Sequence, residues 1–290
     1  MPSDSPVFPR IAIVGLGLVG GSMAFAARRA WPSTHVLAVD RQAVLREGLS
    51  RRAIDAGAAD LAAAVADADL IVLAAPVRQN VGLLRQIAPH VPASAVVTDV
   101  GGTKRAIVDA AAALPLTFVG GHPLGGGARG GFEFATASLF TRRPWIFTPP
   151  AGELRPSVHE AVERLSAFVT GLGALPTTMS AADHDRLLAL ISHLPQLAAT
   201  ALMEVVGTTV AGGGLRLAGQ GLVDTTRLAS SPADVWRDIC LTNADEIGRA
   251  LDLLIERLSD LRSDLHRTEV VDAVFEQAAH WRAELMKGRE

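Results

Sequence analysis

The sequence of 290 residues contains one cysteine, Cys240, and no tyrosine. A lone cysteine cannot form an intrachain disulfide, which is typical of the reducing cytoplasm, and it excludes a four-cysteine zinc site. We expect no metal site. The absence of tyrosine excludes every class of dehydrogenase that depends on a catalytic tyrosine. Cys240 lies in the apolar helical pattern VWRDICL, where a buried small hydrophobic side chain is a better interpretation than a thiolate nucleophile.

Long runs of one kind of residue are also missing. The formal net charge is -3 and no extended basic run is present, so we expect no nucleic-acid partner. The first ten residues, MPSDSPVFPR, lack the apolar centre of a signal peptide. No run of about 18 uncharged apolar residues occurs, so we expect no membrane span. These absences together predict a cytoplasmic protein.

Up to about residue 180, short apolar runs alternate with alanine-rich helical patterns. The runs cover residues 11–17, 36–40, 70–76, 95–101, 116–123, 144–150 and 174–180. Continuous apolar strands that alternate with helices predict the α/β class, with a doubly wound, Rossmann-type parallel sheet covered on both faces. We expect right-handed crossover connections and a dinucleotide-binding domain over residues 1–180.

After residue 180 the strand pattern stops. Helical spacing of apolar residues covers 183–206, a glycine-rich stretch at 212–221 interrupts it, and a long amphipathic pattern begins at the serine pair before Pro232. A last helix is predicted over 268–287. We therefore expect an all-helical second domain over residues 181–290.

The stretch GLGLVG places Gly15, Gly17 and Gly20 in the G-x-G-x-x-G spacing, around Leu18 and Val19. The stretch follows a predicted strand and opens a predicted helix, which is the context that the dinucleotide fingerprint requires. The phosphates of the cofactor would then face the amino terminus of this helix.

Asp40 ends the second predicted strand, twenty positions after Gly20. Its carboxylate would accept hydrogen bonds from the adenosine ribose and repel a 2′-phosphate, which favours NAD over NADP. Arg41 follows directly and weakens this preference, because an arginine could pair with that phosphate.

Other strand ends should meet the cofactor at the same edge of the sheet. They carry AAPV (74–77), DVGGTK (99–104) and GGHPLGGG (120–127), so Ala75, Pro76 and Asp99 are candidate cofactor-binding residues. His122 would lie at the mouth of the dinucleotide site, and neutral imidazole is the side chain suited to accept a proton near pH 7.

Five blocks together resemble the prephenate and arogenate dehydrogenases of tyrosine biosynthesis. They are IAIVGLGLVGGS, DVGGTK, GGHPLGGGARGGFEFATASLFTRRPWIFTP, DHDRLLALISHLPQ and DTTRLASSPADVWRDICLTN. The resemblance implies a Rossmann domain, a helical domain that forms a homodimer, and NAD- or NADP-dependent oxidative decarboxylation of prephenate to 4-hydroxyphenylpyruvate.

The resemblance also implies roles for single residues. His122 would take the proton of the ring hydroxyl, Ser192 and His193 would lie in the substrate site, and Arg227 would bind a substrate carboxylate. Gln196 occupies a place where many members have histidine, and we include it among the substrate-binding residues. Two further departures are Gly102, where serine is common, and the run 126–131, where many members read GTEKSG.

Several alternatives remain open at this point. The substrate could be arogenate or an amino-substituted prephenate, or the protein could be a catalytically silent NAD-binding regulator. His193 could make a purely structural hydrogen bond, and His184 could cap a helix or orient the site. Asp224 and Arg227 could form a structural ion pair.

Overall fold

The computed structural model describes residues 5–125, 130–152 and 155–287. It divides into two compact units, residues 1–244 and 245–290, which are described separately. The first unit contains an eight-stranded sheet. Its strands are β1 (Arg10–Val14), β2 (His35–Val39), β3 (Ala56–Ala58), β4 (Leu70–Leu73), β5 (Val96–Asp99), β6 (Thr117–Pro123), β7 (Pro144–Thr148) and β8 (Leu175–Thr178).

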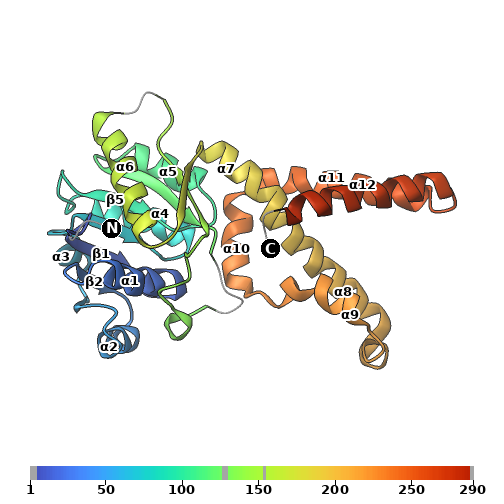
Figure 1. The fold of residues 1–290 in the computed structure, drawn as a ribbon, viewed down its shortest axis with the longest axis horizontal. Helices are drawn as coiled ribbons and strands as arrows, with labels where there is room; N and C mark the ends of the chain where they lie inside the picture. The colour runs from blue at the N-terminus through green and yellow to red at the C-terminus, as the bar shows by residue number, and fades with distance from the viewer. Residues whose placement is uncertain (1–4, 126–129, 153–154, 288–290) are drawn as a thin grey trace. The chain divides into compact units, whose positions relative to one another are not determined.

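The strand order is β3-β2-β1-β4-β5-β6-β7-β8, and strands β1 to β6 pair in parallel (Figure 1). The chain moves outward from β1 in one direction and then returns to add β4 on the other side. This reversal creates the switch point at which doubly wound sheets bind ligands. The predicted fold class is confirmed, and each predicted apolar run overlaps a strand.

Two details of the sheet differ from the prediction. Strand β7 pairs antiparallel to β6, with His122 opposite Ile146, and a short strand, β3, extends the other edge. Between β6 and β7 the described residues contain only a short 3-10 turn, η1 (Phe132–Phe134), instead of the crossover helix that a parallel pair needs. Strand β3 reads Ala-Gly-Ala, which carries almost no strand propensity.

Helices cover both faces of the sheet. The cores of the two faces are separate clusters of buried residues. One face is covered by α1 (Leu18–Ala30), α2 (Gln42–Ser50) and α6 (Pro156–Gly171), and the other by α3 (Leu61–Val65), α4 (Val77–Ile87) and α5 (Arg105–Ala112). Ile11 and Ile13 of β1 point into the first cluster, and Ala12 and Val14 point into the second. A strand buried on both faces requires this continuous apolar run.

The chain then continues through helices. They are α7 (Ala181–Leu188), the π-helical turn η2 (Ala189–His193), α8 (Leu194–Leu215), α9 (Gln220–Thr225), the 3-10 turn η3 (Arg227–Ser230) and α10 (Ala233–Thr242). The π turn ends two residues before Pro195. Proline lacks the N–H that would bond the carbonyl four residues earlier, so the helix widens here. Helix α8 runs to Leu215, so the glycines at 212–214 do not end it as the sequence pattern indicated.

Within the described residues, the helical stretch 181–210 is long and apolar enough, by length and composition, to cross a membrane. Its first two turns carry His184 and Asp185, which are fully buried in the first unit. Only 22% of its most apolar window is buried. The stretch therefore presents apolar surface that is uncovered in the single chain.

The second unit consists of most of α11 (Ala244–Ser263) and of α12 (Thr268–Met286). Asn243 separates α10 from α11, so the long amphipathic pattern after Pro232 forms two helices. The predicted last helix is confirmed by α12 within one residue. The proposed domain boundary at 180/181 lies between β8 and α7, whereas the compact units divide after Ala244.

Candidate active site

The first glycine loop brings β1, β4 and α1 into close contact. Gly15 has a φ of 103°, and a Cβ atom there would lie 2.7 Å from the carbonyl oxygen of Ala74. A Cβ atom on Gly20 would lie 2.0 Å from the carbonyl oxygen of Gly15. Gly17, in contrast, faces open space and precedes the first residue of α1, with no side chain capping the helix. The N–H groups of Leu18, Val19 and Gly20 are therefore placed to bind an anion.

Asp40 lies beside this loop at the end of β2. Its Oδ2 atom accepts the Leu16 N–H at 2.6 Å, and its Oδ1 atom accepts the Arg41 N–H at 2.6 Å. The Arg41 side chain is almost fully exposed, and its Nε atom lies 3.9 Å from Oδ1 of Asp40. The carboxylate is oriented by the backbone and is partly open to solvent, as ribose hydroxyl groups would require.

The turn between β4 and α4 contains the candidates Ala75 and Pro76. The buried side chain of Asn80 accepts the Ala75 N–H and donates to the carbonyl oxygens of Leu73 and Ala75. Asp238 of α10 accepts the N–H of Arg78 at 2.9 Å, at the start of α4. The shape of this turn is therefore set by an asparagine that the sequence analysis did not single out.

Asp99 ends β5 and is fully buried. Its carboxylate accepts the N–H groups of Gly101 and Gly121 and forms a short ion pair with the ammonium group of Lys104. Lys104 also donates to the Gly121 carbonyl oxygen at 2.7 Å. Burial lowers the pKa of Lys104, and the Asp99 carboxylate opposes this shift. Asp99 therefore braces β6 against β5 through bonds that lie within the protein.

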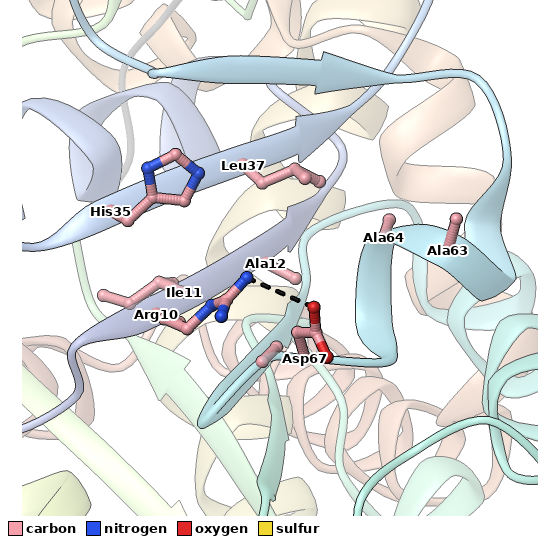
Figure 2. Close-up of a pocket in the computed structure, with 9 residues that line it drawn as sticks. Arg10, Ile11, Ala12, His35, Leu37, Ala63, Ala64 and Asp67 are labelled. Carbon is pink, nitrogen blue, oxygen red and sulfur yellow. Dashed lines mark hydrogen bonds and ion pairs between the residues drawn. The ribbon is translucent and has the colours of Figure 1, made fainter.

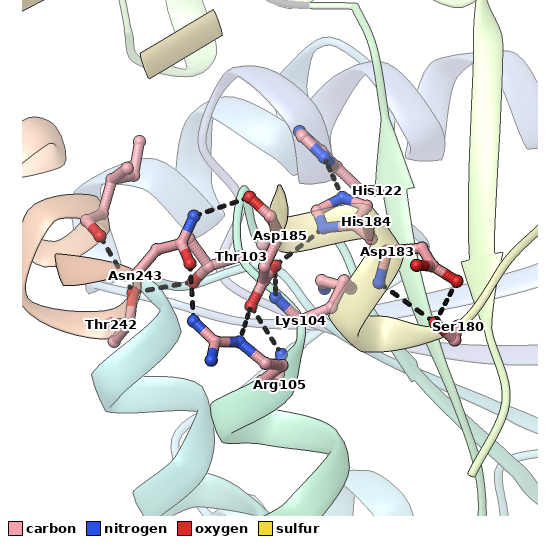
Figure 3. Close-up of polar contacts among 12 residues, drawn as sticks. Thr103, Lys104, Arg105, His122, Ser180, Asp183, His184, Asp185, Thr242 and Asn243 are labelled. Atoms are coloured by element: carbon pink, nitrogen blue, oxygen red, sulfur yellow. Dashed lines mark hydrogen bonds and ion pairs between the residues drawn. The ribbon is translucent and has the colours of Figure 1, made fainter. Parts of the chain in front are cut away.

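His122, at the end of β6, is joined to two residues of α7 (Figure 3). Its Nδ1 atom lies 2.9 Å from Nε2 of His184, and Nδ1 of His184 lies 2.8 Å from Oδ1 of Asp185. His184 and Asp185 are fully buried, while His122 is partly exposed. The three side chains form one hydrogen-bonded chain that ends at the open side of His122.

Asp185 accepts four further hydrogen bonds. Oδ1 accepts the Lys104 N–H at 2.7 Å, and Oδ2 accepts both the N–H and the Nε–H of Arg105. Asn243 donates to the Asp185 carbonyl oxygen at 2.8 Å, and its own side-chain oxygen accepts from Arg105. These charge-assisted bonds tie the amino terminus of α5 to α7.

The histidines of the cluster are held in their neutral form. Burial, together with the neighbouring His184, Lys104 and His193, holds the pKa of His122 well below its ordinary value. Burial also lowers the pKa of His184, although its hydrogen bond to Asp185 opposes the shift. Burial lowers the pKa of His193 to about 4. At neutral pH the imidazole of His122 is therefore free to accept a proton.

His193 lies in the π turn and is buried, with its Nδ1 atom 3.4 Å from Nδ2 of Asn243 and its ring edge-on to Trp236. Ser192 lies in the same π turn and is partly exposed, and no bond from its hydroxyl group is found within the described part of the chain. Asn243 links His193 to Asp185, and so to the His122 chain.

Gln196 and Arg227 have different surroundings, because the side chain of Gln196 is buried and that of Arg227 is exposed. The Gln196 amide donates to the Leu228 carbonyl oxygen at 2.7 Å and accepts from Ser231, so it holds η3 against α8. Arg227 is exposed at the start of η3. Among the described residues no ion pair joins it to Asp224, whose side chain instead accepts from Gln220.

Lys104, Asp185 and Asn243 belong to this cluster but were not among the site residues predicted from the sequence. A signal for Lys104 existed, because the chain has only two lysines, Lys104 and Lys287, among 27 basic residues. The compact ammonium group, fully buried, donates to the Asp99 carboxylate and to the Gly121 carbonyl oxygen. Asp185 stands next to His184 in the quoted block, but its burial could not be read from the sequence.

Two other features of the described chain lie outside this cluster. A cavity of about 140 Å³ opens at the amino ends of β1 and β2, lined in part by His35 and by the exposed ion pair of Arg10 with Asp67 (Figure 2). It lies at the edge of the sheet opposite the glycine loop. Across the described residues, no group of three or more His, Cys, Asp or Glu side chains is arranged to hold a metal ion. The departures noted at 126–129 lie outside the described residues.

Two family models match the chain in succession. Residues 23–175 match the model described as "Prephenate dehydrogenase, nucleotide-binding domain", and residues 180–281 match "Prephenate dehydrogenase, dimerization domain". Together the two matches cover most of the chain and meet close to the end of β8.

Comparisons with individual proteins point to the same family. The chain is 34% identical to a prephenate dehydrogenase of Bacillus subtilis (strain 168) over 262 residues, 87% of this chain and 69% of that protein. It superposes on a prephenate dehydrogenase from A. aeolicus, solved in complex with hydroxyphenyl propionate and NAD+, with a TM-score of 0.86 and 25% identity over 96% of this chain and 97% of that one.

A third comparison is with a protein named for a different substrate. The Synechocystis arogenate dehydrogenase superposes with a TM-score of 0.81 and 28% identity, over 95% of this chain and 99% of that one. The order of the two family domains, the shared fold and the identity over nearly the whole chain lead to one assignment. This chain belongs to the prephenate dehydrogenase family.

Proposed function

We propose that the protein is an NAD-dependent prephenate dehydrogenase that converts prephenate to 4-hydroxyphenylpyruvate in tyrosine biosynthesis. The proposal rests on the position of His122. Its imidazole is neutral and partly exposed, and it lies at the carboxyl end of β6, at the same edge of the sheet as the glycine loop. In support, 87% of the chain aligns with a relative named prephenate dehydrogenase.

The residues of the glycine loop fit the cofactor. The open space at Gly17 and the free N–H groups at the start of α1 suit the pyrophosphate, and Asp40 suits the adenosine ribose. When bound, NAD supplies the acceptor for the hydride that leaves the ring carbon bearing the hydroxyl group.

The protein must supply a base and hold the substrate. His122 accepts the hydroxyl proton at Nε2 as the ring carbon becomes a carbonyl carbon. The ring carboxylate then leaves as carbon dioxide, and its bonding electrons enter the ring. The carbonyl oxygen takes up a proton to give the phenol. Aromatisation drives this loss, so it requires no metal or acid catalyst.

Ser192, His193 and Arg227 are the proposed substrate-binding residues. His193 remains neutral near pH 7, because burial lowers its pKa to about 4, so it would act as an N–H donor. Arg227 has an exposed guanidinium group, which suits a carboxylate because two parallel N–H bonds fix its orientation. Gln196 contributes indirectly, by holding η3 in place.

Arogenate is the second candidate substrate, as a solved relative bears that name. Arogenate carries an ammonium group where prephenate carries a ketone, and an ammonium group needs an acidic or carbonyl partner. In the described polar cluster the two carboxylates, Asp99 and Asp185, are fully buried and already bonded within the protein. Prephenate is therefore the preferred candidate, and a silent regulator would have no need of the His122 chain.

One assay tests the proposal. Formation of NADH is followed with prephenate and with arogenate, side by side, for the wild type and for His122→Asn. We expect turnover with NAD, with kcat/KM higher for prephenate. Turnover of arogenate alone would assign the second substrate, and turnover of neither, with NAD still bound, would favour the regulator.

The dimerization domain of the family suggests a homodimer as the working form. Large apolar side chains are exposed along α8, α11 and α12, among them Val205, Leu253, Ile255, Phe275 and Trp281. Uncovered apolar surface of this extent is typical of an interface. Neither nucleic acid nor a membrane is part of the proposal, and light scattering at micromolar concentration should give twice the mass of the chain.

A further inference from the structure

We propose that His184 and Asp185 are positioning residues that fix the tautomer of His122, with hydrogen on Nδ1 and a free lone pair on Nε2. The inference rests on the proposed function, in which His122 is the base. It extends that function, because it assigns a role to two buried residues that touch neither the substrate nor the cofactor.

Asp185 sets the direction of the chain. Its carboxylate accepts the N–H groups of Lys104 and Arg105 and the Nε–H group of Arg105. Three such donors stabilise the ionised carboxylate, and the pKa of Asp185 is lowered despite its burial. An ionised carboxylate has no hydrogen to donate. The contact of 2.8 Å with His184 therefore requires hydrogen on Nδ1 of His184.

His184 passes this constraint to His122. A neutral imidazole has one N–H group, so with hydrogen on Nδ1 its Nε2 atom is an acceptor. This Nε2 atom lies 2.9 Å from Nδ1 of His122. His122 must then donate from Nδ1, which leaves its Nε2 atom without hydrogen. The opposite arrangement needs a cationic His184, and burial next to Lys104 disfavours that charge.

The free nitrogen faces the open side of the cluster. A Cβ atom placed on Gly102 would lie 4.0 Å from Nε2 of His122 and 3.6 Å from Ile239 of α10. Gly102 itself is partly exposed. The lone pair is thus presented between the β5–α5 loop and α10, on the side away from His184, where a substrate hydroxyl group could reach it.

The first test reads the tautomers directly. The wild-type protein, with histidine labelled in the ring by 15N, is examined at pH 7.5 by long-range 1H–15N correlation, without substrate. His122→Asn and His184→Phe identify the two sets of signals. We expect a protonated Nδ1 and an unprotonated Nε2 for both residues. Hydrogen on Nε2 of His122 would overturn the inference.

The second test separates positioning from simple packing. His184→Phe keeps an aromatic ring but removes the acceptor, whereas His184→Gln supplies an amide oxygen near the position of Nε2. We expect kcat of the Phe variant to fall about 10- to 100-fold, the usual effect of a lost orienting partner, with little change in NAD affinity. The Gln variant should stay within a few-fold of the wild type. Equal losses in both variants, or a loss in neither, would contradict the inference.

A matched control lies on the same helix turn. Asp183→Asn removes an exposed carboxylate that bonds only Ser180 and Arg186 in the described structure, and it should leave both kcat and the tautomers unchanged. The two proposals fail in different ways. A wild type that oxidises neither prephenate nor arogenate defeats the proposed function, while the NMR experiment still reads the tautomer. An active wild type with hydrogen on Nε2 of His122 defeats only the positioning role.

Discussion

His122 Nδ1 lies 2.9 Å from His184 Nε2, although the two residues are 62 positions apart in the chain. The contact joins the end of β6 to α7, the first helix after the sheet. Each ring is oriented by the other, and His184 is in turn oriented by Asp185. The same contact leaves Nε2 of His122 on the open side of the cluster, where it can accept a proton.

His122→Asn tests the base. Asparagine keeps a hydrogen-bonding group of similar reach but cannot take up a proton near neutral pH. We expect kcat with prephenate to fall by roughly 10²- to 10⁴-fold, the span usual for a lost general base, while the Kd for NAD is unchanged. His90→Asn, at an exposed histidine, is the control for assay and fold. An Asn variant that retained most of its kcat would place the base elsewhere, and His193 would be tested next.

The pH dependence of the rate should reflect the environment of His122. Burial and the neighbours His184, Lys104 and His193 lower the pKa of His122 well below 6.5. The neutral form is the active base, so kcat/KM should stay level as the pH falls through 6.5 and should decline only at more acidic pH. Initial rates between pH 4.5 and 8 measure this profile. A decline centred at 6.5 or above would show that the imidazole is more solvated than the structure indicates.

Stability should fall on acidification because of His193. Its folded-state pKa is lowered to about 4 from an ordinary value of 6.5, so between these values the unfolded chain binds more protons than the folded one. The stabilisation is complete above pH 6.5 and is lost as the pH falls toward 4. This shift corresponds to about 3 kcal/mol.

Urea unfolding at pH 7 and pH 4.5, at one fixed protein concentration, measures this effect. His193→Asn should lose less stability between the two pH values than the wild type does. His35→Asn, at a half-exposed histidine for which burial is small, should lose as much as the wild type. An equal loss in all three proteins would exclude His193 as the source.

The strands could be predicted from the sequence because each is a continuous apolar run, and the glycine spacing before α1 located the cofactor loop. The direction of β7 could not be predicted. Its pairing depends on how residues 124–143 return, and they contain no apolar period that distinguishes a hairpin-like return from a crossover. Strand β3 was missed because its pairing with β2, rather than its own residues, makes it a strand.

The residues of the active-site cluster also divide into those that could be predicted from the sequence and those that could not. His122 was identified because it ends a strand at a known edge, a local feature. Lys104, Asp185 and Asn243 meet through contacts between residues 58 to 81 positions apart, and each residue alone would fit an exposed loop or helix. Gln196 was assigned to the substrate from its place in a motif, but its amide is used in bonds to η3. These roles depend on which side chains are buried and on which groups they bond, and the tertiary structure determines both.

Asp40 should determine the choice between NAD and NADP. Asp40→Asn removes the negative charge but keeps one oxygen acceptor for the Leu16 N–H. Because a carboxylate repels a 2′-phosphate at short range, we expect the preference of kcat/KM for NAD over NADP to shrink at least about tenfold. Asp67→Asn, at the opposite edge of the sheet, should leave the ratio as it is. A wild type equally efficient with both cofactors would contradict the assignment.

Arg227 should bind a substrate carboxylate through both N–H groups of its guanidinium fork. Arg227→Lys keeps the charge but loses this geometry, and Arg227→Ala loses both. Lysine still attracts a carboxylate and alanine does not, so the KM for prephenate should rise strongly in the Ala variant and less in the Lys variant. NAD affinity should not change in either. Arg216→Ala, at another exposed arginine after α8, controls for loss of surface charge. If both Arg227 variants kept the wild-type KM, this exposed side chain would have no part in substrate binding, and the carboxylate would need a different partner, with Ser192 and His193 the first to test.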